Sequence, residues 1–491
     1  GGRAGVEAVV VAGVLGAGGL AYLGWPYLLH PPPSSDIESN NIPRYSLPPP
    51  SGPRLLRLWN ASMRLARHVF VFLPLVWLYI PAAVWGGGAL DAWWRWFLGA
   101  IESSGPALIK FAQWTATRTD MFPAELCLRF SLLQSGARTH QLSASKANLE
   151  EVFAGSAGTL VSIEETPVGS GCIAQVHRAV ISTPDKGEQK VAIKLLHPGV
   201  LELTRLDVDL LRSLGDVVDL VPMLRWLSLR ESVEEFSTLI GSQLDLRLEA
   251  ENLERFASDF ASWKDLSFPL PIRPLVSNAV LVETFQDGVP LAEWIKGPRS
   301  EETETKRELA RIGVRSFLHM CFRHNFIHGD LHPGNILVNI SPGGDPVVSM
   351  TMLDAGITTE LTERDRRNFR ALFSAIVQGN GEEAGRLMIS HARAHECKDP
   401  DAFCAAIGAL VDQALTTNLS LGKIQAGKIL AEAFALACIH RVKIESNFAS
   451  VCIAIMVLEG VGRNLDPNLN VLRAAAPILL TPVGRAIESR A

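Results

Sequence analysis

The eight residues from His328 to Asn335, which read HGDLHPGN, constrain the fold and chemistry of this chain more than any other segment. Asp330 and Asn335 stand five positions apart, and the glycines and proline around them favour a tight loop that can bring both side chains together. The Asp330 carboxylate can accept a proton from a hydroxyl group or from water, and the Asn335 amide oxygen can bind a metal ion. Nineteen residues after Asn335, Asp354 begins the triplet Asp-Ala-Gly, and its carboxylate can coordinate a Mg²⁺ ion that bridges two phosphates.

The two segments have the spacing of the catalytic and metal-binding loops of protein kinases. Kinases place the catalytic Asp and a metal-binding Asn five positions apart in HRDxxxxN, and a DFG triplet follows. In this chain Gly329 stands in the place of the Arg, and Ala355 in the place of the Phe. An Asp-Ala-Gly triplet alone carries little information, but its distance behind HGDLHPGN indicates a metal site made of Asn335 and Asp354.

A nucleotide site should then be encoded upstream, and Lys194 is its first candidate. It ends the sequence VAIK, where a strand would hold its ammonium against the α- and β-phosphates. Such a lysine needs a carboxylate from a helix, and LEAENLERF supplies Glu249, with Glu251 and Glu254 as alternatives. An edge-strand lysine without a role in binding is the alternative interpretation.

Two further segments extend the nucleotide site. VGSGCIAQVH stands where a kinase has the Gly-rich loop over the phosphates, although it lacks the pattern GxGxxG. Its two glycines permit close approach of the backbone to a phosphate. VLVETFQDG occupies the position of the hinge strand that binds adenine. The nucleotide-binding residues expected from these two segments are Gly169, Ser170, Gly171, Cys172 and Glu283.

The distribution of apolar residues predicts an α+β protein. Alternating, β-branched runs within 158–196, separated by Gly- and Pro-rich turns, indicate a small antiparallel sheet, with a further strand pair at 269–285. Helical periodicity predominates elsewhere, at 100–150, at 200–262 and beyond 303, apart from short strands at 327–357. A β-rich part followed by a helical part resembles the architecture of protein kinases, a two-lobed fold with a small β-rich N-lobe and a helical C-lobe.

The N-terminal part of the chain is unusually apolar. Residues 8–29 carry no charge over 22 positions, which is long enough to cross a hydrocarbon core of about 30 Å. A signal-peptide core and a buried helix are the alternatives. Residues 68–90 are also uncharged, but Pro74 and Pro81 favour a kinked segment at the membrane interface or packed on the protein over a second span. The basic residues ahead of this stretch, which could pair with anionic headgroups, are Arg54, Arg57, Arg64 and Arg67.

Composition narrows the function classes. The chain has 46 basic and 51 acidic residues and a net charge of −5, which argues against nucleic acid as a partner. Its 7 cysteines include no CxxC pair, which suits a reducing compartment. His391, His395 and Cys397 would have metal-ligand spacing on one helix face, but an exposed helix followed by a loop is the favoured interpretation. The apolar stretch 403–463 predicts an ordinary helical core, with a lipid-binding groove as the alternative.

Together these segments resemble the UbiB/aarF-domain family of atypical kinases. The resemblance rests on HGDLHPGN, Asp-Ala-Gly, VAIK, a small-residue loop ending in QVH, and IKFAQ at 109–113, which is similar to the family's KxGQ signature. Lys110 and Gln113 are three residues apart, so on a helix they share one face and can point together into a site. The details GSGCIAQVH and QLD, which begins at Gln243, look most like the mitochondrial aarF domain-containing kinase 2 branch.

The resemblance implies a function and a setting. It implies ATP and Mg²⁺ as cofactors, and catalytic roles for Lys194, Glu249 and Asp330. The supported process would be coenzyme Q (ubiquinone) lipid biosynthesis, through transfer or hydrolysis of the γ-phosphoryl group. The protein would be a single-pass protein of the mitochondrial inner membrane, with a membrane lipid or quinone-like lipid and proteins of a membrane complex as partners. Lys110 and Gln113 would join the nucleotide site on a helix that covers the peptide-docking region, so ordinary protein kinase activity is not expected.

The implied domain organisation has five parts. A transmembrane anchor is expected at 1–30, a Pro-rich linker at 31–53 and a membrane-proximal helical extension at 54–150. A kinase-like N-lobe with its hinge would follow at 151–288, and a helical C-lobe would occupy 289–491.

Two departures from the family pattern bear on activity. Ala112 replaces the Gly of KxGQ, and Gln243 replaces the Glu of an ExD motif. The phosphotransfer residues are all present, which favours an active kinase or ATPase. A kinase-fold scaffold with little or no activity is the main alternative, and an aminoglycoside- or choline-type phosphotransferase would leave KFAQ unexplained.

Overall fold

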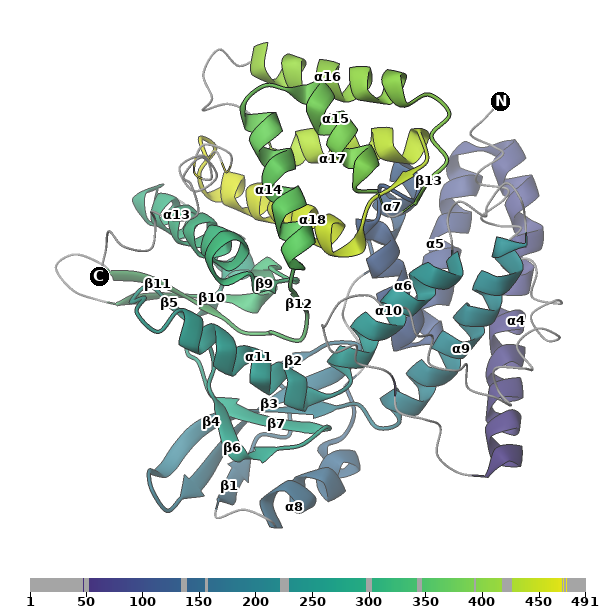
Figure 1. The fold of residues 1–491 in the computed structure, drawn as a ribbon. Helices are drawn as coiled ribbons and strands as arrows, with labels where there is room; N and C mark the ends of the chain where they lie inside the picture. Colours follow the sequence, from purple (N-terminus) through teal and green to yellow (C-terminus); the bar gives the residue numbers. More distant parts are fainter. Residues whose placement is uncertain are drawn as a thin grey trace.

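The computed structural model shows two lobes and a bundle of N-terminal helices beside them (Figure 1). The described residues are 53–133, 139–154, 158–220, 229–296, 303–341, 347–392, 394–416 and 426–469, with Leu47, Val471 and Ala474. The expected anchor at 1–30 and most of the expected linker at 31–53 lie outside them. The predicted α+β, kinase-like fold is confirmed.

The N-terminal bundle precedes the sheet in the chain. Its helices are α4 (Arg54–Trp85), α5 (Gly87–Ser104), α6 (Pro106–Thr117) and α7 (Ala124–Phe130). Helix α4 runs for 32 residues with Pro74 and Pro81 inside it. It ends because Gly86 takes φ 63°, a left-handed conformation that favours glycine. The uncharged stretch predicted for 68–90 is therefore divided between two helices.

The N-lobe is an antiparallel sheet in the order β1-β3-β4-β7-β6, with β2 paired to β3. Its strands are β1 (Thr159–Ile163), β2 (Gly169–Ser170), β3 (Ala174–Thr183), β4 (Gly187–Leu196), β6 (Pro271–Val276) and β7 (Val280–Thr284). One face of the sheet packs on α8 (Lys146–Ala154), which η1 (Leu142–Ser145) precedes, and forms a small separate core with Leu149. The strands predicted within 158–196 and 269–285 are confirmed.

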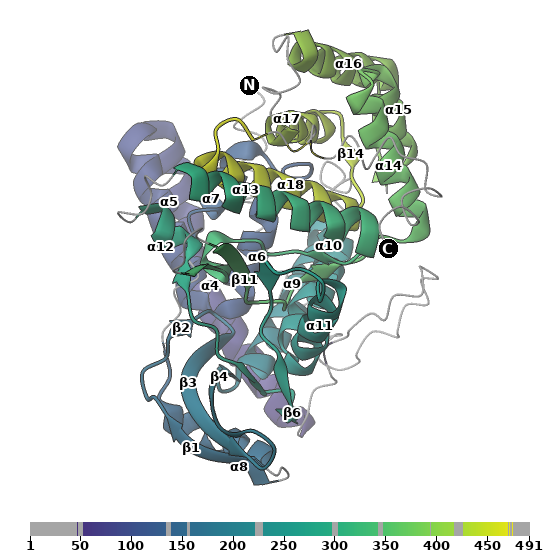
Figure 2. The same ribbon diagram turned by 90° about the vertical axis from the view of Figure 1, so that its left-hand side faces the viewer.

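Three helices connect the first strands of the sheet to the last ones. They are α9 (Val200–Asp219), α10 (Leu229–Gln243) and α11 (Leu246–Asp259). Asp245 caps α11, since its side chain accepts a hydrogen bond from the backbone N–H of Arg247. Figure 2 shows α11 between the sheet and the C-lobe, where it can carry side chains from one lobe to the other.

The C-lobe is mostly helical and holds both motif loops. Its helices are α12 (Leu291–Lys296), α13 (Thr303–His319), the π-helix η4 (Met320–His324), the 3₁₀ turn η5 (Pro333–Asn335), α14 (Glu363–Val377), α15 (Gly381–Ser390), α16 (Pro400–Thr416), α17 (Ala426–Ile439) and α18 (Ser446–Leu465). Its strands are β5 (Leu266–Ser267), β8 (Val289–Pro290), β9 (Ile327–His328), β10 (Ile336–Ser341), β11 (Val347–Met352), β12 (Thr358–Thr359), β13 (Ala394–His395) and β14 (Val442–Lys443). One large hydrophobic core joins these helices to α9–α11 and to the N-terminal bundle.

The proposed metal spacing in HARAHEC is not realised on a helix. Helix α15 ends at Ser390, and His395 lies in strand β13, which pairs with β14. His391 and His395 therefore do not share a helix face, and the loop expected after the helix contains a strand. Within the described ranges no group of three His, Cys, Asp or Glu side chains could hold a metal ion.

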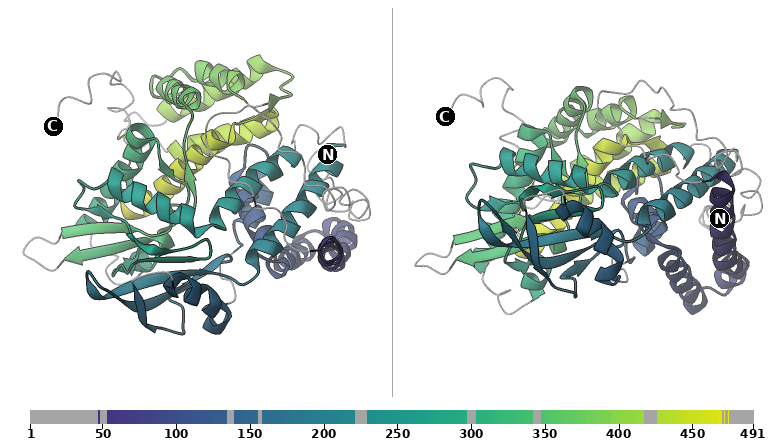
Figure 3. Two further views of the ribbon diagram at one scale, coloured as in Figure 1. Left: turned by 60° about the horizontal axis from the view of Figure 1, so that its bottom comes forward. Right: turned by 90° about the horizontal axis from the view of Figure 1, so that it is seen from below.

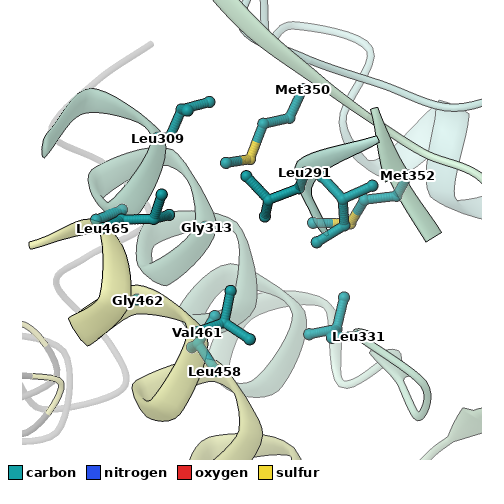
Figure 4. Close-up of a pocket in the computed structure, with 12 residues that line it drawn as sticks. Leu291, Leu309, Gly313, Leu331, Met350, Met352, Leu458, Val461, Gly462 and Leu465 are labelled. Carbon is teal, nitrogen blue, oxygen red and sulfur yellow. The ribbon is translucent and has the colours of Figure 1, made fainter. Parts of the chain in front are cut away.

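An apolar cavity lies between α13, α18 and strand β11 (Figure 4). It encloses about 20 Å³, roughly the space of one water molecule, which is too small for a lipid chain. Fully buried side chains of the stretch 403–463, among them Phe403, Phe434 and Cys452, belong to the large core. This packing favours the ordinary core predicted there over the lipid groove.

Two described helices are long and apolar enough to cross a membrane. In Asn447–Leu465 half of the apolar window is buried, as expected of a core helix, whereas in Leu55–Trp85 only 22% is buried. Helix α4 lies at the edge of the molecule in Figures 1 and 3. Its large exposed apolar residues, here called the α4 stripe, include Trp59, Met63, Phe70, Trp77, Ile80 and Val84.

A buried ion pair fixes the opposite side of α4. The Nε and Nη2 atoms of Arg64 each lie 2.7 Å from a different carboxylate oxygen of Asp207 on α9, and His68 Nε2 lies 2.9 Å from Oδ1. Arg64 also donates to the backbone carbonyl of Ser104 at the end of α5. The expectation that Arg64 faces lipid headgroups is therefore wrong, because its guanidinium is held inside the protein by a carboxylate 143 residues away.

Replacement of Asp207 by Ala should lower the free energy of unfolding by about 3 kcal/mol, because it leaves the buried Arg64 guanidinium without its counter-charge. Urea unfolding followed by tryptophan fluorescence measures the change. The control is Glu304→Ala, which removes a side chain 90% exposed in its pair with Arg307 and should change stability by no more than about 0.5 kcal/mol. Equal effects of the two variants would contradict the assigned role of the Arg64–Asp207 pair.

Candidate active site

Lys194 lies at the centre of a charged cluster at the junction of the two lobes. Its Nζ atom lies 2.6 and 2.8 Å from the two carboxylate oxygens of Glu249, and 3.0 Å from Oδ2 of Asp354. Lys194 comes from β4, Glu249 from α11, and Asp354 from the segment after β11. The structure thus brings together the lysine, the helix carboxylate and the metal-loop carboxylate that the sequence predicted separately.

The alternation of β4 places Lys194 in this position. Val191, Ile193 and Leu195 are fully or almost fully buried in the core under α8, so the intervening Ala192 and Lys194 face the other side of the sheet. Lys194 pairs in register with Leu281 of β7, and Ala192 with Glu283. The lysine is therefore a central-strand residue that faces the C-lobe, not an edge residue.

The orientation of helix α11 shows which of the three candidate glutamates is the partner of Lys194. Glu249 is 4% exposed and points to Lys194, whereas Glu251 and Glu254 are exposed. Glu254 Oε1 instead accepts a hydrogen bond of 2.8 Å from Arg273. Another α11 side chain holds the Asp354–Gly356 segment, here called the metal loop. Asn252 Nδ2 donates a hydrogen bond to the backbone carbonyl of Ala355 at 2.9 Å.

The cluster holds more negative than positive charge. Burial opposes the ammonium form of Lys194, but Asp354 and Glu249 together hold its pKa above the usual value. Burial raises the pKa of Glu249 to about 7, although the contact with Lys194 pulls it down. Against burial, Lys194 and the backbone N–H of Gly356 hold the pKa of Asp354 below its usual range. Because one ammonium faces two carboxylates, the cluster keeps a net negative charge, which a divalent cation would balance.

The catalytic loop is held by its own histidine. The ring of His328 is 1% exposed, and its Nδ1 atom accepts a hydrogen bond of 3.1 Å from the backbone N–H of Asp330. Burial lowers the pKa of His328, which fits the structural role predicted for it. Asn335 Nδ2 donates to the carbonyl of Asp330 at 3.3 Å, and the carbonyl of Asn335 accepts from the N–H of Leu353 at 2.9 Å. These bonds tie the catalytic loop to the residue before Asp354.

Gly329 is required by a close approach of the two loops. Its backbone N–H donates to the carbonyl of Ile357 at 2.8 Å. A Cβ atom at this position would lie 2.5 Å from Cγ2 of Ile357. A larger side chain, such as the Arg found here in protein kinases, would push the catalytic loop away from the segment after Asp354.

The segment expected to cover the phosphates forms the β2 turn. The backbone N–H of Gly171 donates to the carbonyl of Ala174 at 2.9 Å, and the Oγ atom of Ser170 is buried without a hydrogen-bond partner. His197, the residue after β4, approaches the carbonyl of Gly171 to 2.8 Å through Nε2. Burial raises the pKa of the Cys172 thiol, and the charge of Lys110 opposes this shift.

Helix α6 brings Lys110 toward the same region, but not Gln113. The positive charge of Lys110 contributes, after Lys194 and the Gly356 N–H, to the lowered pKa of Asp354. Gln113 instead donates through Nε2 to the backbone carbonyl of Leu133 at 3.3 Å. The two side chains of the KxGQ-like motif thus have different surroundings.

Besides Ser170, two further polar side chains at the site have unpartnered atoms. The carboxyl of Glu283 is 9% exposed, and its Oε2 atom is buried without a hydrogen-bond partner. Burial, with the nearby charge of Glu249, raises the pKa of Glu283 to about 8. Gln243 Nε2 is likewise buried and unpartnered, and its Cγ would lie 3.8 Å from a Cβ at Gly356. Sequence reasoning assigned Gln243 to the QLD motif, but it did not predict this position beside the metal loop.

The residues present fit a nucleotide-bound Mg²⁺ ion. Mg²⁺ is usually held by one or two carboxylates together with phosphate oxygens, so a cage of three protein ligands is not required. Asp354 has a side chain 40% exposed beside the excess negative charge, and the neighbouring loop carries Asn335. This donor set suits a hard cation that arrives with a phosphorylated ligand.

Known families match most of the described chain. Residues 133–388 match the ABC1 atypical kinase-like domain, and residues 409–470 match the UbiB helical domain. Both motif loops, Lys194 and Glu249 lie inside the first match, whereas Lys110 precedes it.

Three similar proteins cover most of the chain. A Dictyostelium discoideum protein named "Probable serine/threonine-protein kinase" is 34% identical over 87% of this chain and 70% of its own length. A mitochondrial ABC1 family protein of Saccharomyces cerevisiae is 32% identical over 83% of this chain and 72% of its own. A "Probable protein kinase UbiB" of Shewanella piezotolerans is 28% identical over 77% of this chain and 68% of its own.

Replacement of Glu283 by Gln should remove a pH dependence of stability. Burial raises the pKa of this carboxyl from its usual 4.5 to about 8 in the folded protein, so the folded state binds the proton more tightly. Its contribution to stability is complete below about pH 4.5 and is lost as the pH rises to about 8. The advantage of Glu283→Gln over wild type should therefore grow by at least about 1.4 kcal/mol, the equivalent of one pKa unit, between about pH 5 and about pH 8.

Urea unfolding at the two pH values measures this growth. Glu254→Gln is the control, because a hydrogen bond from Arg273 lowers the pKa of Glu254 and its stability contribution is lost only as the pH falls. An advantage of Glu283→Gln that stays constant with pH would show that Glu283 is ionised throughout.

Proposed function

Because this chain belongs to the ABC1 family of atypical kinases, we propose that it binds MgATP between its lobes and transfers or hydrolyses the γ-phosphoryl group. The observation that carries the proposal is the Lys194–Glu249–Asp354 cluster, with both oxygens of Glu249 within 2.8 Å of the Lys194 ammonium. Active protein kinases need this lysine–glutamate pair and a metal-binding Asp together.

Each residue has one role in the proposed reaction. Lys194 holds the α- and β-phosphates, and Glu249 fixes the lysine in position. Asp354 and Asn335 hold the metal ion, which neutralises charge on the phosphates. Asp330 accepts the proton of the attacking hydroxyl or water, on a backbone that His328 holds in place. Gly169, Ser170, Gly171 and Cys172 form the turn over the phosphates.

We propose a small molecule or water, rather than a peptide, as the phosphoryl acceptor. Helix α6 packs against α5 and α7 of the N-terminal bundle on one side and against α9 and α10 on the other, and it brings the charge of Lys110 to the metal loop. The family resemblance implies that a helix at this place covers the region where a peptide substrate would dock. A kinase-fold scaffold without turnover is the alternative that the experiments below separate.

We propose a mitochondrial membrane setting in support of coenzyme Q metabolism. The Saccharomyces cerevisiae relative is named as mitochondrial, and the bacterial relative is named UbiB. The apolar segment 8–29 and the exposed α4 stripe would attach the chain to the inner membrane. Liposome flotation tests this attachment: protein lacking residues 1–30 should float less than the full chain, and equal flotation would contradict an anchor there.

MgATP should stabilise the protein by about 2.7 kcal/mol at a concentration one hundred times its dissociation constant. Asp354→Asn should lose the Mg²⁺-dependent part of this stabilisation, because it removes a metal ligand. Asp330→Asn should keep binding and lose turnover, because it removes the proton acceptor. Thermal-shift titration and phosphate release measure the two effects.

The outcomes distinguish the two candidate functions. Loss of turnover in both variants, with binding kept only in Asp330→Asn, supports the enzyme. Nucleotide binding by wild type without phosphate release supports the scaffold. Folded wild-type protein that binds no nucleotide would contradict MgATP binding altogether.

Lys110→Ala should change the affinity for ATP or the turnover by several-fold, because a cation near the metal loop makes charge-assisted contacts with phosphate. Lys146→Ala on α8 is the matched control, since its side chain is 73% exposed. ATP dissociation constants and phosphate release are measured for both. A Lys110→Ala variant equal to wild type in both quantities would show that α6 does not act on the site.

A further inference from the structure

A pair of facing histidines contacts the β2 turn, and the proposed phosphoryl transfer uses neither of them. Nδ1 of His140, which lies shortly before η1, is 2.8 Å from Nδ1 of His197, the residue after β4. His197 Nε2 lies 2.8 Å from the carbonyl of Gly171, and its backbone N–H donates to the carbonyl of Ile173 at 2.8 Å. A charge on this pair therefore acts directly on the segment expected to cover the phosphates.

The hydrogen bonds of the pair determine where its protons lie. A carbonyl oxygen only accepts, so Nε2 of His197 carries a hydrogen and donates it to Gly171. In the neutral ring of His197 the other nitrogen, Nδ1, is then an acceptor, and Nδ1 of His140 donates to it. Nε2 of neutral His140 accepts in turn from the hydroxyl of Ser145, 2.7 Å away. One proton thus lies between the two rings.

The buried side chain of Gln175 on β3 holds the backbone of His140 in place. Its amide donates to the carbonyl of His140 and accepts from the N–H of the same residue, both at 3.0 Å. The amide nitrogen also lies 2.8 Å from Nε2 of His177, whose Nδ1 is 2.7 Å from the carbonyl of Glu164. His177 is therefore neutral, with its hydrogen on Nδ1, and an added proton has no acceptor there.

The half-buried pair can take up one further proton, and only one. A proton added to Nε2 of His140 is accommodated when the hydroxyl of Ser145 rotates, because the hydroxyl oxygen can accept where it had donated. A second added proton would place two N–H groups against each other across the 2.8 Å contact of the rings. The pair is thus a site for a single positive charge, joined to the Gly171 carbonyl by the hydrogen bond of His197.

The surroundings favour the neutral pair in the ligand-free protein. Burial, and then the charges of His197 and His177, lower the pKa of His140. The adjoining elements also carry the charged side chains Lys146 of α8, Arg178 of β3, Lys194 of β4, and Glu202 and Arg205 of α9, which form ion pairs of their own, and Lys110 of α6, whose charge acts on Cys172 in the turn.

A polyphosphate under the β2 turn would favour the protonated pair instead. A nearby opposite charge stabilises the charged form of a titratable group. A protonated ring also makes a stronger hydrogen bond than a neutral one, so the contact from His197 to the Gly171 carbonyl would strengthen. Uptake of the proton would therefore hold the turn in place while the ligand is bound.

We propose that the His140–His197 pair takes up one proton from solvent when a polyphosphate binds under the β2 turn, and that the protonated pair holds this turn on the ligand. The inference rests on the proposed function, because it presupposes that a nucleotide binds between the lobes. It assigns the pair a positioning role through Gly171, separate from the roles of Lys194 and Asp354 in binding the phosphates and the metal ion.

The test counts the protons taken up when the full-length protein binds the hydrolysis-resistant β,γ-imido analogue of ATP with Mg²⁺. Calorimetry in two buffers that differ in ionisation enthalpy gives this count at about pH 6 and about pH 8, on either side of the usual histidine range. Wild type is compared with His197→Gln, whose amide keeps a donor for the Gly171 carbonyl but cannot gain a proton. His391→Gln, at the end of α15 in the C-lobe (Figure 1), is the control, because it removes a histidine remote from the turn.

Wild type should take up about 0.3 to 1 proton more than His197→Gln at about pH 6, and the same number at about pH 8. Because the ligand raises the pKa of the pair, the extra affinity is complete below the pKa of the free pair and is lost as the pH rises through that of the bound pair. The affinity of wild type relative to His197→Gln should therefore fall about three- to tenfold from the lower to the higher pH, within the limit of about tenfold per pH unit for one linked proton.

The comparison isolates the pair from the other groups that titrate in this range. The carboxyls of Glu249 and Glu283 have pKa values of about 7 and about 8, but wild type and variant share them, so their protons cancel in the difference. The control His391→Gln should match wild type in proton count and in affinity at both pH values.

Three results would overturn the inference. Equal proton counts in wild type and His197→Gln, with the nucleotide bound by both, would show that the pair gains no proton and would leave the proposed function standing. A count lowered equally by His391→Gln would show that the proton does not belong to this pair. Wild-type protein that binds no nucleotide would contradict the inference and the proposed function together. If His197→Gln does not fold, the same count on His140→Gln, which removes the partner ring, decides the question.

Discussion

The contact of one ammonium with two carboxylates connects the parts of this molecule. Lys194 comes from the N-lobe sheet, Glu249 from the helix between the lobes, and Asp354 from the segment after β11, yet both carboxylates lie within 3.0 Å of the Lys194 nitrogen. Neighbouring residues hold these three side chains in position. The apolar face of β4 sets the direction of the lysine, Asp245 caps the helix that carries Glu249, and Asn335 binds the residue before Asp354 through its backbone.

The three carboxyl groups near Lys194 differ because their surroundings differ. Asp354 has the ammonium, a backbone N–H and solvent, so it favours the ionised form. Glu249 shares the ammonium but is buried, which holds its pKa near 7. Glu283 is buried and has no contact with the lysine, so its pKa is higher still. The ligand-free site therefore has carboxylate oxygens that can bind a cation, and a buried carboxyl oxygen of Glu283 without a hydrogen-bond donor.

The sequence predicted those features that local chemistry dictates. Lys194, Asp330, Asn335 and Asp354 could be identified because few residue types perform phosphoryl transfer and their spacing is restrictive. The choice of Glu249 over Glu251 could not be made, because two residues turn a helix by roughly 200° and only packing reveals which face is inward. Arg64 looked like a lipid-facing residue because its partner Asp207 is 143 residues away. The orientation of Glu283 needed the pairing register of β7, which a sequence does not contain.

The separation of the cluster residues along the chain also determines when the site can exist. Lys194 and Asp354 are 160 residues apart, whereas the small core of the N-lobe is complete once β7 has formed. During synthesis the sheet can therefore fold before Asp354 has been added to the chain, since domains generally fold from the N-terminus as the chain emerges. The guanidinium of Arg118 donates a hydrogen bond to the carbonyl of Ile444, which is 326 residues away, so this contact can form only later still in synthesis. For a nascent chain, competence to hold a ligand would thus be acquired late, after the lobe that carries Lys194 is already built.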